Sequence, residues 1–171
     1  VLGNGRGSAA AAGVARRIPL QMGTLSKAIG SYGGFICAAK PVIDLLINRA
    51  RSLIYATGLP PAAVAAASAA LDVIEKDEQL VRIPMERAQR FTRQLSLPEP
   101  ESTIVPLITG TAETALAASR VLAEEGFLVT AIRPPTVPEG TARLRFTFAA
   151  HHSDEDIDRL VAAVRKTGIL S

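Results

Sequence analysis

The chain is poor in aromatic residues and contains no cluster of basic residues. Of its 171 residues only 4% are aromatic, and its net charge of +3 comes from arginines that are spread along the sequence. A groove for nucleic acid needs clustered lysine and arginine together with rings on which bases can stack. We therefore expect no nucleic-acid partner.

Long apolar runs and paired cysteines are also lacking. The alanine-rich stretch 61–71 is too short and too weakly hydrophobic to cross a bilayer, so we expect a soluble, cytoplasmic protein without a membrane partner. The single cysteine, Cys37, excludes an internal disulfide and fits a reducing compartment. Because it lies in the apolar run 33–38 without a nearby basic residue, we expect a buried, unreactive thiol.

The start of the chain is informative as well. Val1 is not a methionine, and residues 1–8 have neither the basic start nor the apolar core of a signal peptide. We expect the chain to be cut from a longer protein. Apolar residues make up 48% of it, which is enough for a substantial core in one medium domain or two small ones.

Apolar periodicity and turn residues predict an α/β chain. The last helix should begin at Ser153, which forms a cap pair with Asp156, and should end at Gly168. Pro84 is expected to kink or restart the helix that begins at Asp77. In order, the predicted elements are strands near 18–22 and 35–39, helices 41–48, 61–75 and 77–95, strand 104–108, helix 112–125, strands 127–132 and 144–148, and the last helix. The gapless small side chains of helix 61–75 suggest close packing against another helix or subunit.

One of the four lysines has an unusual setting. Lys27 lies in the segment 23–34, among glycines, hydroxyls and apolar residues, and no acidic neighbour can pair with it. A partly desolvated lysine loses its proton more easily and can attack an aldehyde. Thr24, three residues earlier, supplies a hydroxyl that could bind a phosphate. Lys40, Lys76 and Lys166 have the contexts of solvated charges.

On spacing alone, other interpretations of the glycine-rich segments stay open. An ordinary Gly/Ser loop with an exposed lysine also fits residues 23–34. A Walker A loop does not fit, because Ser26 stands where that motif has glycine. The early run 3–7 lacks the preceding strand of a dinucleotide fingerprint and is better interpreted as a turn.

Three segments in order carry a family resemblance. Residues 23–34, residues 54–61 (Ile-Tyr-Ala-Thr-Gly-Leu-Pro-Pro) and residues 131–145 (from Ala-Ile-Arg-Pro-Pro-Thr-Val-Pro to Leu-Arg) resemble the α-oxoamine synthase family of fold-type I pyridoxal-phosphate enzymes. The resemblance extends over nearly the whole chain and points to the C-terminal half of such an enzyme. It implies that residues 1–78 end the large cofactor-binding domain and that residues 79–171 form a small C-terminal α+β domain.

The resemblance also implies an activity. Within the family, the second and third segments look most like the homodimeric enzyme that condenses L-alanine with pimeloyl-CoA, or with a pimeloyl carrier protein, in biotin synthesis. This is a decarboxylative acyl transfer that uses pyridoxal 5′-phosphate. Glycine C-acetyltransferase and 5-aminolevulinate synthase are the nearest sibling activities. The acyl-chain preference does not follow from these segments.

The matched positions receive roles by the same resemblance. Lys27 would form the Schiff base with the cofactor and then act as the acid and base on the substrate. Thr24 would bind the cofactor phosphate, and Thr57 would reach the phosphate of the partner subunit's cofactor. Arg145 would hold the amino-acid carboxylate, as a guanidinium can with both oxygens. Thr136, in a proline-restricted stretch, would contact the substrate.

Three further residues receive plainer interpretations. Arg143 shares the predicted strand face of Arg145 and is expected to be solvated. His151 and His152 have no carboxylate or cysteine at metal-ligand spacing, so we expect surface residues and no metal site.

The family's aspartate that pairs with the pyridine nitrogen would lie upstream of Val1, as would its two histidines near the ring. A chain without them is expected to be inactive alone. An interpretation from another class therefore stays open, in which the chain is a folded but inactive dimerisation module.

Overall fold

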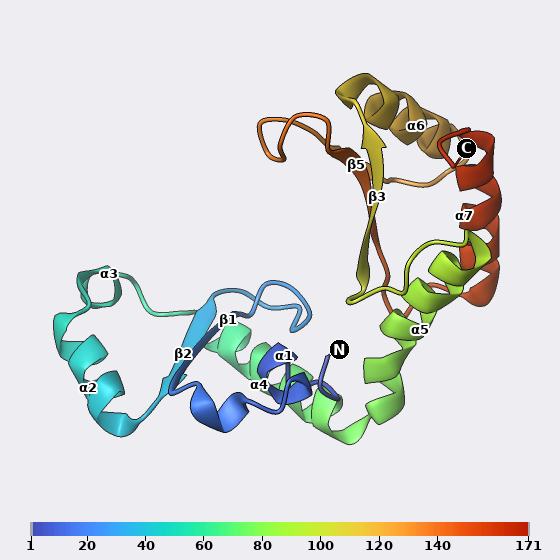
Figure 1. Ribbon diagram of the computed structural model, residues 1–171. Coiled ribbons are helices and arrows are strands. Elements are labelled where there is room, and N and C mark those ends of the chain that lie inside the picture. Colours follow the sequence, from blue (N-terminus) through green and yellow to red (C-terminus); the bar gives the residue numbers. More distant parts are fainter. Residues whose placement is uncertain (1, 171) are drawn as a thin grey trace. The chain divides into compact units, whose positions relative to one another are not determined.

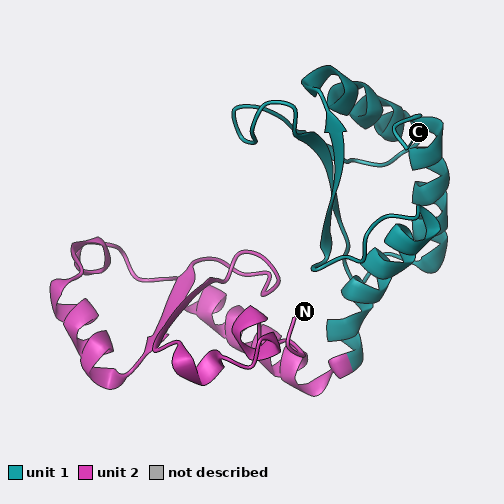
Figure 2. Cartoon of the chain, in the orientation of Figure 1, with its two compact units in different colours: residues 1, 79–171 teal, residues 2–78 magenta. Residues whose placement is uncertain are grey.

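The structure is a computed structural model that describes residues 2–170, and these residues form two compact units. Unit 2 comprises residues 2–78, and unit 1 comprises residues 79–170 (Figures 1 and 2). Among the described residues, no helix is both long and apolar enough to span a membrane.

Unit 2 is built on a two-stranded antiparallel hairpin. Strand β1 (Leu20–Thr24) pairs with β2 (Gly34–Ala38) along its whole length. The other elements are α1 (Ser8–Ala11) and the 3-10 turn η1 (Ala15–Arg17) before the hairpin, and α2 (Lys40–Arg49), α3 (Arg51–Ile54) and α4 (Pro61–Lys76) after it. The predicted strands and the two longer helices are confirmed within two residues, whereas α1, η1 and α3 were not predicted.

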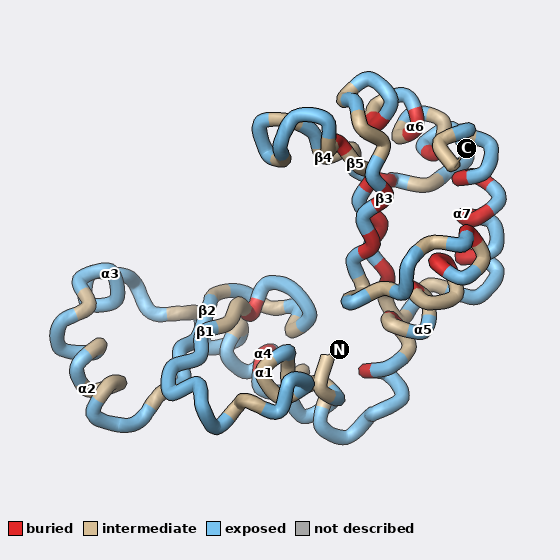
Figure 3. Tube along the Cα trace, in the orientation of Figure 1, coloured by how far each residue is buried: buried red, intermediate tan, exposed pale blue. Residues whose placement is uncertain are grey.

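The apolar side chains of unit 2 are mostly exposed. Only Leu25 and Ala67 are buried, and most of the small residues of α4 are exposed (Figure 3). Cys37 on β2 is also exposed, and the prediction of a buried thiol is therefore wrong. The reason is local, because within residues 2–170 β2 pairs only with β1 and most of its side chains are exposed.

Unit 1 contains a three-stranded antiparallel sheet in the order β3-β5-β4. Its elements are α5 (Glu78–Gln94), β3 (Ile104–Gly110), α6 (Ala112–Glu124), β4 (Thr130–Ile132), β5 (Ala142–Thr147) and α7 (Asp154–Lys166). Side chains alternate along β5, so that Leu144 and Phe146 are buried while Arg145 and Thr147 are exposed. The buried face packs on the three helices, whereas the side chains of the other face are largely exposed within residues 2–170. We call this second face the open face.

Aromatic rings from the helices and the sheet meet in this core. The ring of Phe91 on α5 lies 4.7 Å from that of Phe146 and 5.1 Å from that of Phe148, measured between centroids. Buried residues of α6 and α7 complete the cluster, among them Leu122, Ile157 and Val164. Unit 1 thus has a core of its own.

Three sequence predictions can be compared with the structure of unit 1. The last helix is confirmed with its capping box, in which Ser153 and Asp156 each satisfy a backbone N–H of the other. Helix α5 continues through Pro84 and does not restart there. Strand β4 begins only at Thr130, because residues 127–129 do not pair with β5. The predicted strand 127–132 is therefore too long.

Candidate cofactor and substrate site

Lys27 lies in the loop 25–33 that joins β1 to β2. The N–H of Leu25 donates to the carbonyl oxygen of Gly33 over 2.9 Å, and the N–H of Ser31 donates to the carbonyl of Leu25 over 2.8 Å. The carbonyl of Lys27 accepts from the N–H of Gly30 over 2.9 Å. These bonds, with the buried side chain of Leu25, give the loop a defined conformation.

Two hydroxyls stand beside the lysine. The Oγ1 of Thr24 lies 2.7 Å from the Oγ of Ser26, and it accepts the N–H of Ser26 over 3.2 Å. Threonine and serine at this spacing form a local side-chain turn, and this is the sequence signal that would have found Ser26. Sequence reasoning singled out Thr24 and missed its partner.

The side chain of Lys27 is exposed within residues 2–170. The prediction of a partly desolvated lysine is therefore wrong for this chain taken alone, because the described elements supply no apolar cover. Lys27 makes no ion pair in this part of the chain, whereas Lys40 pairs with Asp44 over 2.8 Å. Its ammonium group is thus available to a ligand.

The lysine loop is attached to the segment that precedes and opens α4. The hydroxyl of Ser31 donates to the carbonyl of Ala63 over 2.6 Å, and Gly33 packs against the side chain of Leu59. Thr57 lies two residues before Leu59, is exposed, and makes no hydrogen bond among the described residues. The structure therefore brings the segment that holds Thr57 against the loop that holds Lys27.

The other two predicted site residues lie in unit 1. Arg145 is the central exposed residue of the open sheet face, with Pro106 of β3 on one side and Thr130 of β4 on the other. It has no ion pair or hydrogen bond from its side chain within residues 2–170. Arg143 differs, because it is half-buried and its Nε donates to the carbonyl of Thr141 over 2.9 Å. The prediction that Arg143 is solvated is therefore wrong.

Thr136 lies in the loop between β4 and β5. Its N–H donates to the carbonyl of Arg133 over 3.1 Å, and its side chain is exposed. The preceding Pro134-Pro135 bond is cis. Arg145 lies further along β5 on the open sheet face, so both predicted substrate residues belong to the β4–β5 part of unit 1.

His152 is half-buried, which corrects its prediction as a surface residue. Its Nδ1 accepts the N–H of Ala149 over 3.3 Å, and its carbonyl accepts from Nε of Arg87 over 2.9 Å. Burial, the largest cause, and the neighbouring His151 lower the pKa of His152. No sequence pattern signalled this arrangement, since Arg87 lies far away in the chain.

The chain is similar to a known protein family and to named relatives. The model of the aminotransferase class I and II family matches residues 1–164. The 8-amino-7-oxononanoate synthase of Methylocella silvestris is 61% identical over 165 residues, which cover 96% of this chain and 47% of that protein. The 8-amino-7-oxononanoate synthase of Beijerinckia indica is 59% identical over 164 residues, covering 96% of this chain and 42% of that protein.

The chain is also similar in fold to solved structures. Sphingomonas wittichii serine palmitoyltransferase superposes with a TM-score of 0.87 at 27% identity, covering 98% of this chain and 45% of that chain. A structure of SPT with PLP gives a TM-score of 0.88 at the same identity and covers 98% of this chain and 46% of that one.

Two conclusions follow from these comparisons. The predicted resemblance and the predicted fold-type I class are confirmed. The chain spans less than half the length of these curated relatives. With a family model that matches residues 1–164, the chain belongs to the aminotransferase class I and II family.

Proposed function

We propose that the chain is the C-terminal part of a pyridoxal-phosphate-dependent acyltransferase that condenses L-alanine with a pimeloyl thioester to give 8-amino-7-oxononanoate in biotin synthesis. Relatives of that name at about 60% identity support the reaction, and the related SPT with PLP supports the cofactor. The observation that carries the proposal is the hydrogen-bonded loop 25–33, which presents the unpaired amine of Lys27 beside two hydroxyls.

The residues of the loop fit the cofactor. The amine of Lys27 would hold its aldehyde carbon, and the Thr24 hydroxyl, fixed by Ser26, would donate to its phosphate. When bound, the cofactor would supply an electron sink for chemistry at the substrate's α-carbon. Lys27 Nζ would remove the substrate's α-proton and later return it.

The substrate residues would come from unit 1. Arg145 suits the amino-acid carboxylate, because its guanidinium is exposed and free of a competing carboxylate within the described chain. Thr136 would add its exposed hydroxyl from the β4–β5 loop. Arg143 is less suited to this role, since its Nε is already bonded to Thr141.

We further propose a homodimer within a longer polypeptide. The exposed hydroxyl of Thr57 would reach the cofactor phosphate of the partner subunit, and the exposed small residues of α4 would pack against a further helix. Unit 2 would end the large cofactor-binding domain, and unit 1 would be the small domain. The exposed apolar side chains of unit 2 support this, because a stable domain buries such side chains.

The test is cofactor attachment in the full-length protein. We expect Lys27→Ala to abolish the covalent, borohydride-reducible cofactor linkage, and Lys76→Ala to retain it. Lys76 is the matched control, because it is exposed and also lacks an ion pair among residues 2–170. A linkage that survives Lys27→Ala would refute the assignment.

A further inference from the structure

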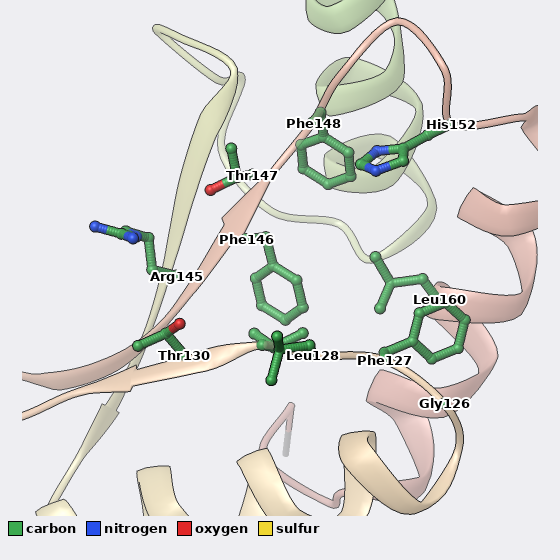
Figure 4. A pocket seen from close by; sticks show the side chains of 11 residues that line it. Gly126, Phe127, Leu128, Thr130, Arg145, Phe146, Thr147, Phe148, His152 and Leu160 are labelled. Atoms are coloured by element: carbon green, nitrogen blue, oxygen red, sulfur yellow. The ribbon is translucent and has the colours of Figure 1, made fainter. Parts of the chain in front are cut away.

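A pocket of about 340 Å³ opens at the edge of the unit 1 sheet where β4 begins (Figure 4). Its apolar wall is formed by Phe127, Leu128, Phe146, Phe148 and Leu160. Its polar groups come from Thr130, Arg145, Thr147 and His152. Within residues 2–170, no aspartate or glutamate lines it. This volume and this mixture of apolar wall and few polar groups are typical of small-molecule sites.

The pocket exists because the pairing of β4 with β5 begins only at Thr130, so the preceding residues 127–129 are not paired with β5. Thr130 is opposite Arg145, so in the same register Leu128 would be opposite Thr147. Leu128 instead is unpaired with Thr147 and has a relative exposure of 97%. Residues 127–129 form no hydrogen bond to Thr147 in the described chain, and the space between the two segments is the pocket.

The backbone of Thr147 is left open to this space. On the other side of β5, the N–H of Phe148 donates to the carbonyl of Thr103 over 2.9 Å. Successive N–H groups of a strand point to opposite edges, so the N–H of Thr147 points to the edge that β4 has left. Its carbonyl lies on the same edge and would be left to water.

Side-chain donors also line the pocket. The hydroxyls of Thr130 and Thr147 and the guanidinium of Arg145 form no side-chain hydrogen bond within residues 2–170. The Nδ1 of His152 accepts the N–H of Ala149, so the neutral ring carries its proton on Nε2. An anionic group in the pocket would therefore meet several donors, and among the described residues that line it there is no carboxylate.

We propose that this pocket binds a small organic anion with an apolar body, such as a medium-chain fatty carboxylate. The carboxylate would accept from the N–H of Thr147 and the adjacent hydroxyls, in the positive field of Arg145. The apolar body would lie against Phe127, Phe146 and Leu160. The inference concerns unit 1 alone and does not depend on the proposed cofactor or reaction.

The probe is sodium octanoate, titrated into the isotope-labelled protein and followed by backbone amide shifts. We expect saturable shifts at Leu128, Thr130 and Thr147 with roughly millimolar affinity, as the small size of the probe allows. Acetate, which lacks the apolar body, and 1-octanol, which lacks the charge, should each bind at least about tenfold more weakly.

Two variants separate the pocket from general apolar binding. Leu128→Asp places a negative charge on the pocket rim and should weaken octanoate at least about tenfold. Ile108→Asp is the control, because Ile108 is half exposed on the same sheet and does not line the pocket. Equal weakening by both variants, equal binding of 1-octanol, or no shift at Thr147 would overturn the proposal. It would also be overturned if octanoate failed to bind while wild type, but not Leu128→Asp, self-associated in sedimentation, since the surface would then be a protein interface.

Discussion

Gly33 packs so closely against Leu59 that a methyl group placed on Gly33 would lie 2.8 Å from both Cδ atoms of that leucine. Gly33 also has a φ of +105°, which side chains rarely adopt. The close contact joins the end of the lysine loop to the segment of Thr57. This close contact and the positive φ explain why the loop needs glycine at position 33.

Gly33→Ala should therefore displace the lysine loop. We expect a cost of roughly 1–3 kcal/mol in the free energy of unfolding and a weaker affinity of the full-length protein for pyridoxal phosphate, measured by absorbance titration. Gly58→Ala is the control, because Gly58 has an ordinary φ and open space around its Cα. Equal losses in the two variants would contradict this account of the contact.

Arg145→Ala in the full-length enzyme should weaken L-alanine binding far more than cofactor loading. Losing a hydrogen bond to a charged group costs roughly 1.5–3 kcal/mol, which is about ten- to 150-fold in affinity. Arg143→Ala shares the strand and should leave L-alanine binding nearly unchanged, although loss of its bond to Thr141 should lower the melting temperature slightly. The readout is the alanine-dependent change of the cofactor spectrum, and similar weakening in both variants would show that the carboxylate anchor is misassigned.

Phe91→Ala should remove the centre of the unit 1 core. The side chain is fully buried and contacts the rings of Phe146 and Phe148, so we expect a loss of roughly 3–5 kcal/mol in the free energy of unfolding by urea. Leu128→Ala, at an exposed position, should change it by less than about 0.5 kcal/mol. A small effect of Phe91→Ala would mean that this core does not hold unit 1 together.

Stability should fall in two steps as the pH is lowered. The pKa of His152 is below its ordinary 6.5, chiefly because of burial, so the unfolded chain binds the extra proton first. The contribution of neutral His152 to the free energy of unfolding is complete above about pH 6.5, and it is lost as the pH falls through the depressed pKa. The pKa values of Asp156 and Asp158 lie below 3.8, because they accept hydrogen bonds from Ser153 and Arg90 respectively. Their contributions are present above that value and are lost below it.

The measurement is urea unfolding across this pH range. His152→Gln should flatten the first step, whereas His151→Gln should largely keep it, since His151 is exposed and only a secondary cause of the shift. Protonation of His152 would also remove the acceptor for the N–H of Ala149. An unchanged first step in His152→Gln would assign it to another group.

Local signals predicted much of the fold. The α7 helix was recognisable from Ser153 and Asp156 because a capping box is contained in four consecutive residues. The late start of β4 at Thr130 was not predictable. Residues 127–129 are as apolar as a strand, and they differ from strand residues only in not pairing with β5.

In the candidate site, too, local sequence signals predicted some features and missed others. The lysine loop follows from glycines and hydroxyls that are close in sequence, and Lys27 was found from them. The exposure of Lys27 and of Cys37 was missed, because a sequence pattern predicts burial without specifying which neighbour provides it. His152 was missed because its partner Arg87 comes from another element.

The uneven burial of the two units bears on biosynthesis. Unit 2 precedes unit 1 in the sequence, yet within the described chain it buries only Leu25 and Ala67 among its apolar side chains. Unit 1 emerges after unit 2 and can collapse at once around Phe91 and its neighbours. Within this chain the order of folding should therefore run opposite to the order of synthesis, and chaperones should meet the nascent hairpin and α4 before unit 1 has folded. In amide exchange, unit 1 should be protected as one cooperative block, while β1, β2 and α4 exchange quickly until other protein covers them.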